Sequence, residues 1–121
     1  MNDLELEISK LEGISFHLEK GNYQVCFIGG FYLLIDSKIG LTSINSRKRT
    51  IITEYKLKTR FYRKRNRGIK YGKFIVEESG DYKIDFKNLN SIIMKKSRLF
   101  SLRLFQKEIS HDKITLLIKK I

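Results

Sequence analysis

Several residue types are missing from this chain or nearly so, and each absence narrows what the protein can be. The 121 residues include no Ala, Pro or Trp and a single Cys. Because a disulfide needs two thiols, Cys26 cannot form an intramolecular one. The chain is instead rich in Ile, Lys and Asn, a bias that a preference for A/T-rich codons would produce in large part.

Targeting and membrane signals are absent too. Residues 1–9 are acidic and alternating, and they lack the basic stretch followed by an apolar stretch that marks a signal peptide. The longest apolar run, residues 25–35, has eleven residues and contains Gly29-Gly30, whereas a membrane-spanning helix needs about 20. We therefore expect a cytoplasmic protein with no transmembrane segment.

The motifs of common enzyme classes are also missing. The sequence has no Gly-x-Ser-x-Gly, no phosphate-binding loop and no dinucleotide-binding fingerprint, since no helical pattern follows Gly29-Gly30. His17 and His111 are the only imidazoles, and neither has a second His or Cys at metal-ligand spacing. We therefore expect no catalysis, no cofactor and no metal.

Two features keep a catalytic alternative open. Cys26 alternates with apolar neighbours, where a Cys usually acts as a small buried hydrophobe, although it could pair with a His as a nucleophile. Two acids around one predicted turn could act as a carboxylate pair, or these acids could form salt bridges with basic residues. The acids are Glu77, Glu78, Asp81 and Asp85. A small hydrolase using His111 or these acids is the resulting alternative.

The dominant hydrophobic period is two, which is typical of strands with one buried face. Apolar and polar residues alternate in 4–8 and 14–18, although the first stretch also fits a short helix. Strands are further predicted at 23–28 and 31–35, as a hairpin around Gly29-Gly30, at 41–44 within a loop, and at 50–62. In 50–62 the odd-numbered residues form a core-like face, and the opposite face is cationic.

The second half continues this pattern. A polar turn at 63–68 joins residues 50–62 to a strand at 69–76, and a second hairpin joins 73–78 to 81–87 around Ser79-Gly80. Residues 74–88 are similar to a hairpin found in many β-sandwich modules of unrelated function, so this similarity implies a fold and no activity. A loop is predicted at 88–97 and closing strands at 99–105 and 113–118.

The composition fits one folded core, because 41% of the residues are hydrophobic and 12% aromatic. We predict an all-β fold, a single antiparallel β-sandwich or jelly-roll of about eight to ten short strands. Residues 1–121 would form one domain.

Positive charge is concentrated in one segment. Residues 47–73 contain twelve Lys or Arg and one acid, Glu54, so they hold +11 of the formal net charge of +12. Six of the eight Arg lie there, which a codon bias over the whole chain does not explain. A local basic excess can attract a polyanion, whereas an even one says little beyond solubility.

The basic hairpin, about residues 56–73, is therefore the candidate binding surface. Its cations could contact successive phosphates, and outward-facing Tyr side chains could stack on unpaired bases. The candidates are Lys56, Lys58, Arg60, Arg63, Lys64, Arg65 and Arg67, with Tyr62 and Tyr71. Arg47-Lys48-Arg49 could extend the surface. Alternatively, these charges could only keep a strand edge from aggregating, and the common RNA-binding signatures are absent.

We expect a non-catalytic binding module whose partner is anionic: nucleic acid, an acidic protein surface or anionic lipid. One alternative is a structural or assembly subunit, phage-like or another oligomeric component, that forms homo-oligomers through strand edges and the basic arm. The small hydrolase is the other alternative.

Overall fold

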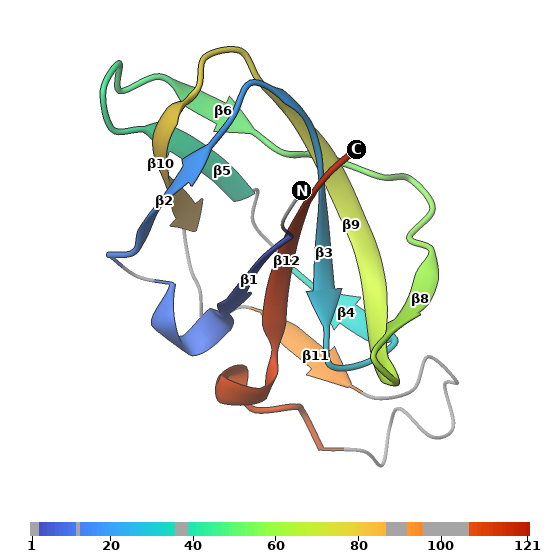
Figure 1. The fold of residues 1–121 in the computed structure, drawn as a ribbon. Helices are drawn as coiled ribbons and strands as arrows, with labels where there is room; N and C mark the ends of the chain where they lie inside the picture. Colours follow the sequence, from blue (N-terminus) through green and yellow to red (C-terminus); the bar gives the residue numbers. More distant parts are fainter. Residues whose placement is uncertain (1–2, 12, 36–38, 87–91, 96–106) are drawn as a thin grey trace.

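The computed structural model describes residues 3–11, 13–35, 39–86, 92–95 and 107–121, and their regular structure consists of antiparallel strands and short 3-10 turns (Figure 1). The predicted all-β class is confirmed. In these described ranges no helix is long and apolar enough to cross a membrane.

The largest sheet has six strands, in the order β1-β12-β3-β9-β7, and β8 also pairs with β9. Its central strands β3 and β12 are apolar on the core face, where Val25, Phe27, Leu116 and Ile118 are buried. The strands are β1 (Leu4–Glu7), β3 (Gly21–Ile28), β7 (Thr53–Glu54), β8 (Arg60–Arg63), β9 (Asn66–Val76) and β12 (Thr115–Lys120).

Two smaller sheets complete the fold. One has four strands in the order β2-β10-β5-β6, and the other pairs β11 with β4. These strands are β2 (Ser15–Leu18), β4 (Tyr32–Leu34), β5 (Ile39–Ser43), β6 (Arg49–Ile51), β10 (Gly80–Phe86) and β11 (Ile93–Lys95). The 3-10 turns η1 (Ile8–Lys10) and η3 (His111–Lys113) precede β2 and β12. Because the strands form three sheets, a single sandwich or jelly-roll is not confirmed.

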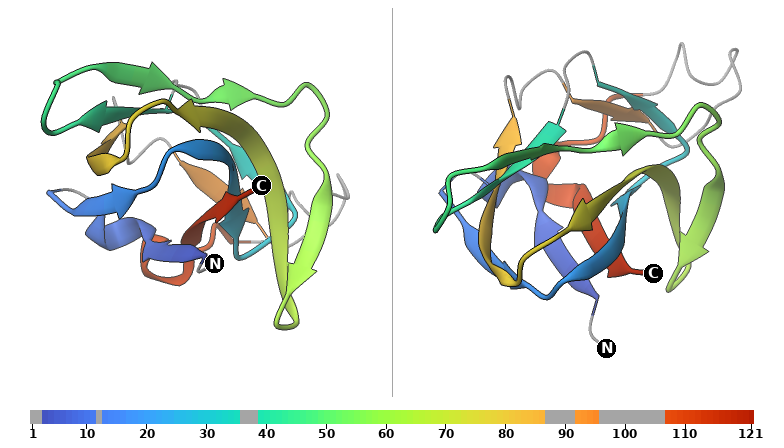
Figure 2. Two further views of the ribbon diagram at one scale, coloured as in Figure 1. Left: turned by 45° about the horizontal axis from the view of Figure 1, so that its top comes forward. Right: turned by 90° about the horizontal axis from the view of Figure 1, so that it is seen from above.

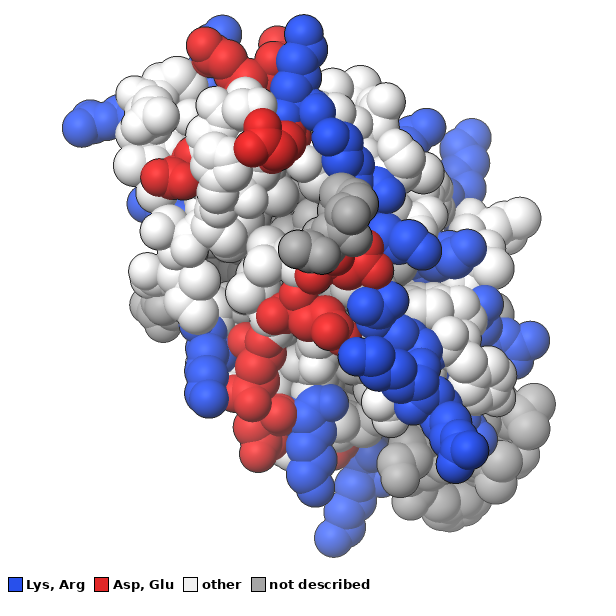
Figure 3. Space-filling view, in the orientation of Figure 1, with Lys and Arg blue, Asp and Glu red and all other residues white. Residues whose placement is uncertain are grey.

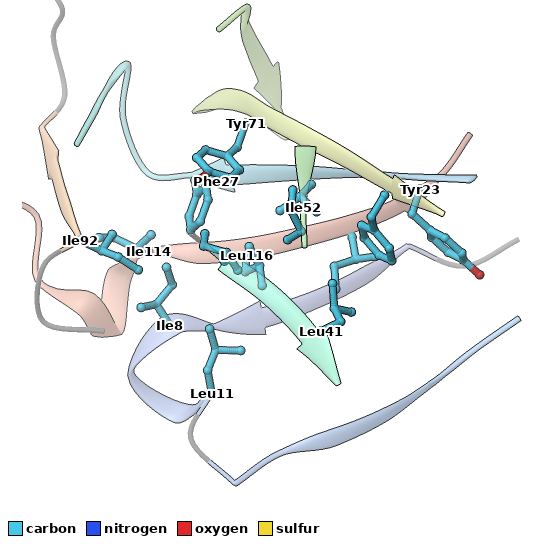
Figure 4. Packing of buried hydrophobic residues seen from close by; sticks show 14 of the residues in the cluster. Ile8, Leu11, Tyr23, Phe27, Leu41, Ile52, Tyr71, Ile92, Ile114 and Leu116 are labelled. Atoms are coloured by element: carbon cyan, nitrogen blue, oxygen red, sulfur yellow. The ribbon is translucent and has the colours of Figure 1, made fainter. Parts of the chain in front are cut away.

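The main core lies between the sheets and draws on both halves of the chain (Figure 4). Phe27 from β3, Leu41 from β5 and Leu116 from β12 are at most 1% exposed. Tyr71 from β9 packs edge-to-face on Phe27, with ring centroids 5.6 Å apart. Burying each such side chain contributes about 1.5–3 kcal/mol, so the fold rests on contacts between segments far apart in sequence.

The predicted hairpin around Gly29-Gly30 is wrong. Strand β3 pairs with β12 on one side and β9 on the other as far as Ile28, so it has no free edge for β4. The chain instead leaves the sheet at Gly29-Gly30, and β4 pairs with β11. A Cβ at Gly30 would collide with the backbone carbonyl of Lys95, so glycine is required by this close backbone approach.

The single long strand predicted at 50–62 is also wrong. The chain forms β6, β7 and β8 with a bend at residues 56–57. Ile52 is the buried residue here, at 4% exposure, whereas Ile51 is 41% and Leu57 is 86% exposed. The even alternation of the sequence therefore does not correspond to one strand face, because the segment passes from the four-stranded sheet to the six-stranded one.

The other expectations have mixed outcomes. Strands are confirmed at 4–7, 15–18, 39–43 and 115–120, and 93–95 forms a strand where a loop was predicted. Strands β9 and β10 belong to different sheets, so the second predicted hairpin is wrong. The strand predicted at 99–105 lies outside the described residues.

A β-bulge divides β9 into two parts. Val25 pairs with Gly72 but Cys26 pairs with Lys70, so Tyr71 is the extra residue on β9. Before the bulge Ile69 and Tyr71 face the core, and after it Phe74 and Val76 do. Without the extra residue these two sets would lie on opposite faces. A bulge also bends its strand, and before the bulge β9 remains paired with β3 from Gly68 to Lys70.

Candidate functional site

Strand β8 and the first part of β9 form the predicted basic hairpin, and Figure 2 shows it projecting beyond the other strands. Arg63 pairs with Asn66, so only Lys64 and Arg65 form the turn. Both have positive φ, 50° and 70°. This is the backbone of a type I′ turn, which usually takes Asn-Gly. A non-glycine residue in this region costs about 1–2 kcal/mol, so the basic tip is held in a strained conformation.

One face of the hairpin continues the outer surface of the six-stranded sheet, to which β8 and β9 belong. Phe61 packs on a small cluster formed by Cys26 and Ile28 of β3 and Leu117 of β12. Gly68 is directly opposite Phe61, and a Cβ there would come within 2.6 Å of the Phe61 ring. Glycine at position 68 therefore lets the ring cross the hairpin, and this packing anchors the arm.

The same face places Arg63 among acids of the N-terminal segment. Its guanidinium lies 3.1 Å from the Asp3 carboxylate and 3.3 Å from that of Glu5. Arg63 is 26% exposed at its side chain. In Figure 3, Lys and Arg side chains run from the hairpin toward the centre of the face and meet acids over β1. Arg63 was predicted as a binding residue, and the structure gives its charge internal partners.

The opposite face of the hairpin carries a second aromatic group, which we call the Phe31 cluster: Phe31, Arg60, Tyr62 and Arg67. The Tyr62 ring meets the Phe31 ring nearly at a right angle, with centroids 5.3 Å apart. The guanidiniums of Arg60 and Arg67 lie 5.4 and 5.1 Å from the Phe31 centroid, within cation–π range. Tyr62 remains 65% exposed, so its ring is both oriented and accessible.

A shallow groove opens beside this cluster. It has a volume of about 340 Å³ and is lined by Phe31, Arg60, Phe61 and Tyr62. This volume is at the lower end of the roughly 300–1,000 Å³ of small-molecule sites. The groove therefore suits one flat group rather than a large ligand.

Three other predicted candidates have different environments. Lys58 forms an ion pair with Glu54 and donates a hydrogen bond to the Tyr55 carbonyl at 2.9 Å. Lys56 is exposed in the bend between β7 and β8. Tyr71 is only 2% exposed and packs on Phe27, where burial raises its pKa to about 12. The placement of Tyr71 on the binding surface is thus corrected to a core position.

Arg47-Lys48-Arg49 does not extend the basic hairpin. It lies at the turn between β5 and β6, at the opposite end of the molecule from the tip of the hairpin (Figures 1 and 2). Arg49 pairs with Asp85, with Nε and Oδ2 3.3 Å apart. Of the four acids that could form salt bridges with the basic hairpin, Asp85 therefore pairs with this second basic segment, and Asp81 contacts His17.

The groups considered for catalysis have structural partners. Burial raises the pKa of Cys26 to about 11, which keeps it a thiol rather than a nucleophilic thiolate. The ring nitrogen Nε2 of His111 lies 2.8 Å from the Ile92 carbonyl. In the described part of the chain, no group of three or more His, Cys, Asp or Glu side chains is arranged to hold a metal ion.

His17 lies between two carboxylates on the edge of the four-stranded sheet. Its Nε2 is 3.0 Å from Glu19 and its Nδ1 is 3.3 Å from Asp81. Hydrogen bonds to Glu19 and then to Asp81 raise the pKa of His17. The hydrogen bond to His17 and another from Ser79 lower the pKa of Glu19. This exposed group links β2 to β10 and to the Ser79 turn.

Two parts of the site had no signal in the sequence. The sequence predicts Phe31 in a buried hairpin, whereas in the structure it meets Tyr62 because the chain changes sheets at Gly29-Gly30. The partners of Arg63 come from the N-terminal segment, where the sequence predicts only a strand or a short helix and no targeting signal. In both cases the contact joins segments about 30 or 60 residues apart, and spacing along the chain cannot reveal it.

No protein-family model, curated protein or solved structure matches this chain.

Proposed function

We propose that this protein is a non-catalytic binding module whose β8–β9 hairpin contacts the phosphates of a nucleic acid. The observation that carries the proposal is the strained basic tip. Lys64 and Arg65 are exposed, and neither forms an ion pair with another described residue. Retaining two cations where Asn-Gly would be more stable is a cost to folding, and such strain is typical of positions with a function.

The chemistry of the hairpin fits phosphate as the anion. Three of its exposed cations, Arg60, Arg65 and Arg67, are arginines, whose planar guanidinium can bind phosphate through two parallel hydrogen bonds. Projection from the body leaves the tip accessible to an extended polyanion. The proposed contact set is Lys56, Arg60, Lys64, Arg65 and Arg67, with Arg63 holding the arm in place.

A salt series tests the proposal. We expect binding to a labelled single strand to weaken with salt at a log–log slope of about −3 to −4, from five contacts at about 0.7 each. The double variant Lys64→Gln/Arg65→Gln removes two contacts and should reduce the slope by about 1.4. Its matched control is Arg47→Gln/Lys48→Gln, which removes the same charge from the β5–β6 turn and should leave the slope nearly unchanged.

Equal effects of the two double variants would mean that net charge, not the hairpin, governs binding. Binding to an acidic polypeptide without binding to nucleic acid would replace the proposed partner by an acidic protein.

One observation favours a second function, that of an assembly subunit. Ile51, Ile75 and Ile121 are 41%, 60% and 70% exposed and line a groove of about 640 Å³ between β6, β9 and the last residue of the chain. Exposed apolar patches often mark protein contacts. Sedimentation at increasing concentration distinguishes the two, because a binding module should remain monomeric without its ligand.

A further inference from the structure

We infer that the Phe31 cluster binds an unpaired nucleobase, so that the hairpin recognises single-stranded rather than duplex nucleic acid. The inference rests on the proposed function, since the cations of the same hairpin would hold the backbone of the strand. It adds a second kind of contact, to the bases, at a site separate from the turn.

The first support is the exposure of Tyr62. Tyr62 is 65% exposed and is therefore not part of the core. Phe31 fixes the orientation of its ring through the edge-to-face contact. A fixed, accessible aromatic ring is what a stacking platform for bases requires, because less conformational freedom is lost on binding.

The second support is the position of the arginines. Tyr62 and Arg67 are directly opposite in the hairpin, and Arg60 is two residues before Tyr62 on β8, so all three side chains share one face. Both guanidiniums are exposed beside the rings. This arrangement puts positive charge next to a π-face, which matches a nucleotide, in which a phosphate lies next to a flat base.

The third support is the groove itself. Its lining includes the residues Phe31, Tyr62 and Arg60 of the cluster, and its small volume fits one flat ring system. In a duplex the bases are stacked inside the helix and cannot reach such a surface, whereas a single strand can turn its bases outward. The groove therefore selects strands with unpaired bases.

The test compares three probes of equal length, about 10 nucleotides, which is within the roughly 4–16 nucleotides of known single-strand sites. They are oligothymidylate, an abasic sugar–phosphate oligomer and a duplex. We expect the full-length protein to bind oligothymidylate about 5- to 150-fold more tightly than the abasic oligomer, the range expected for stacking of one base. The duplex, whose bases are paired, should bind less tightly than oligothymidylate.

Variants of Tyr62 identify the ring responsible. Tyr62→Leu keeps the charge and an apolar side chain but removes the π-face, so it should abolish the preference for oligothymidylate over the abasic oligomer. Tyr62→Phe should retain the preference. Tyr55→Leu changes a half-buried ring outside the cluster and serves as the matched control, which should also retain it. Thermal unfolding establishes that each variant is folded.

The outcomes separate this inference from the proposed function. Equal affinity of the unaltered protein for oligothymidylate and the abasic oligomer would overturn the base site while supporting phosphate binding. A preference that survives in Tyr62→Leu would overturn the assignment to this cluster. If none of the three probes binds, the proposed function fails, and the base site with it.

Discussion

Replacing the turn residues Lys64 and Arg65 should make the protein more stable and at the same time weaken its proposed binding to nucleic acid. In Lys64→Asn/Arg65→Gly the hairpin receives the sequence that a type I′ turn prefers. The two residues now have φ of 50° and 70°. Relief of about 1 kcal/mol at each position gives about 2 kcal/mol, and the greater freedom of glycine in the unfolded chain offsets about 0.5–1 kcal/mol of this.

The net gain of about 1–1.5 kcal/mol is large enough to measure. With an unfolding entropy of about 2.1 cal/mol/K per residue, the 121 residues give a rise in Tm of about 4 °C per kcal/mol. Thermal unfolding followed by circular dichroism should therefore show an increase of about 4–6 °C. The affinity for a single strand should fall in the same protein, because two of the proposed phosphate contacts are lost.

Arg47→Gly provides the matched control for backbone strain. Arg47 also has positive φ, 59°, but lies in the β5–β6 turn. This variant should gain about 0.5 kcal/mol or less and bind nucleic acid as before. An unchanged or lower Tm in the Asn-Gly variant would refute the strained turn, and unchanged affinity would refute the role of the tip in binding.

Three further predictions concern other groups. Arg63→Ala should lower the free energy of unfolding by about 1 kcal/mol in urea titrations, and Arg63→Lys should lose less; no change would mean that Asp3 and Glu5 do not anchor the arm. The pKa of His17 is raised and that of Glu19 is lowered. The contribution of His17 to stability should therefore be complete below its ordinary pKa of about 6.5 and disappear as pH rises through its pKa in the folded protein. The contribution of Glu19 should be complete above its ordinary pKa and disappear as pH falls through its pKa in the folded protein. Titration of the His17 ring by NMR checks the raised pKa, and Asp81→Asn is the control, which should lower the pKa of His17. A His17 ring that titrates as in the unfolded chain would contradict the prediction. Cys26, with a pKa of about 11, should react with thiol reagents near pH 8 only after denaturation, and rapid labelling of the native protein would contradict its burial.

The sequence predicted local structure best where apolar and polar residues alternate without interruption along a single strand. Residues 4–7 and 15–18 alternate evenly, and both form strands. The polar run 63–68 between apolar stretches predicted a hairpin turn, and the turn lies inside it. Alternation and turn residues act over a few neighbours, so such features can be recognised without knowing the rest of the fold.

Pairing and burial at the site could not be predicted in the same way. Which strands lie next to β3 depends on how all the strands of the chain compete for pairing partners. In the structure β12 and β9 occupy the two edges of β3. Tyr62 and Tyr71 look equivalent in the sequence, yet one is 65% and the other 2% exposed. Tyr71 lies where β9 pairs with β3, over the core, whereas Tyr62 lies near the tip of the hairpin, opposite Arg67. The pairing of β9 with β3 depends on contacts between distant segments.

The bulge in β9 also bears on how this protein could change without losing its fold. The side-chain phase changes at Tyr71, and beyond it Tyr23 pairs with Phe74 and Gly21 with Val76, so β3 rather than the hairpin fixes the core-facing pattern from Phe74 to Val76. A matched pair of residues inserted into β8 and β9 near the tip would lengthen the arm by one cross-strand pair and preserve every inward position after the bulge. The reach of the arm, and with it the length of strand it could follow, can therefore vary while the core stays the same.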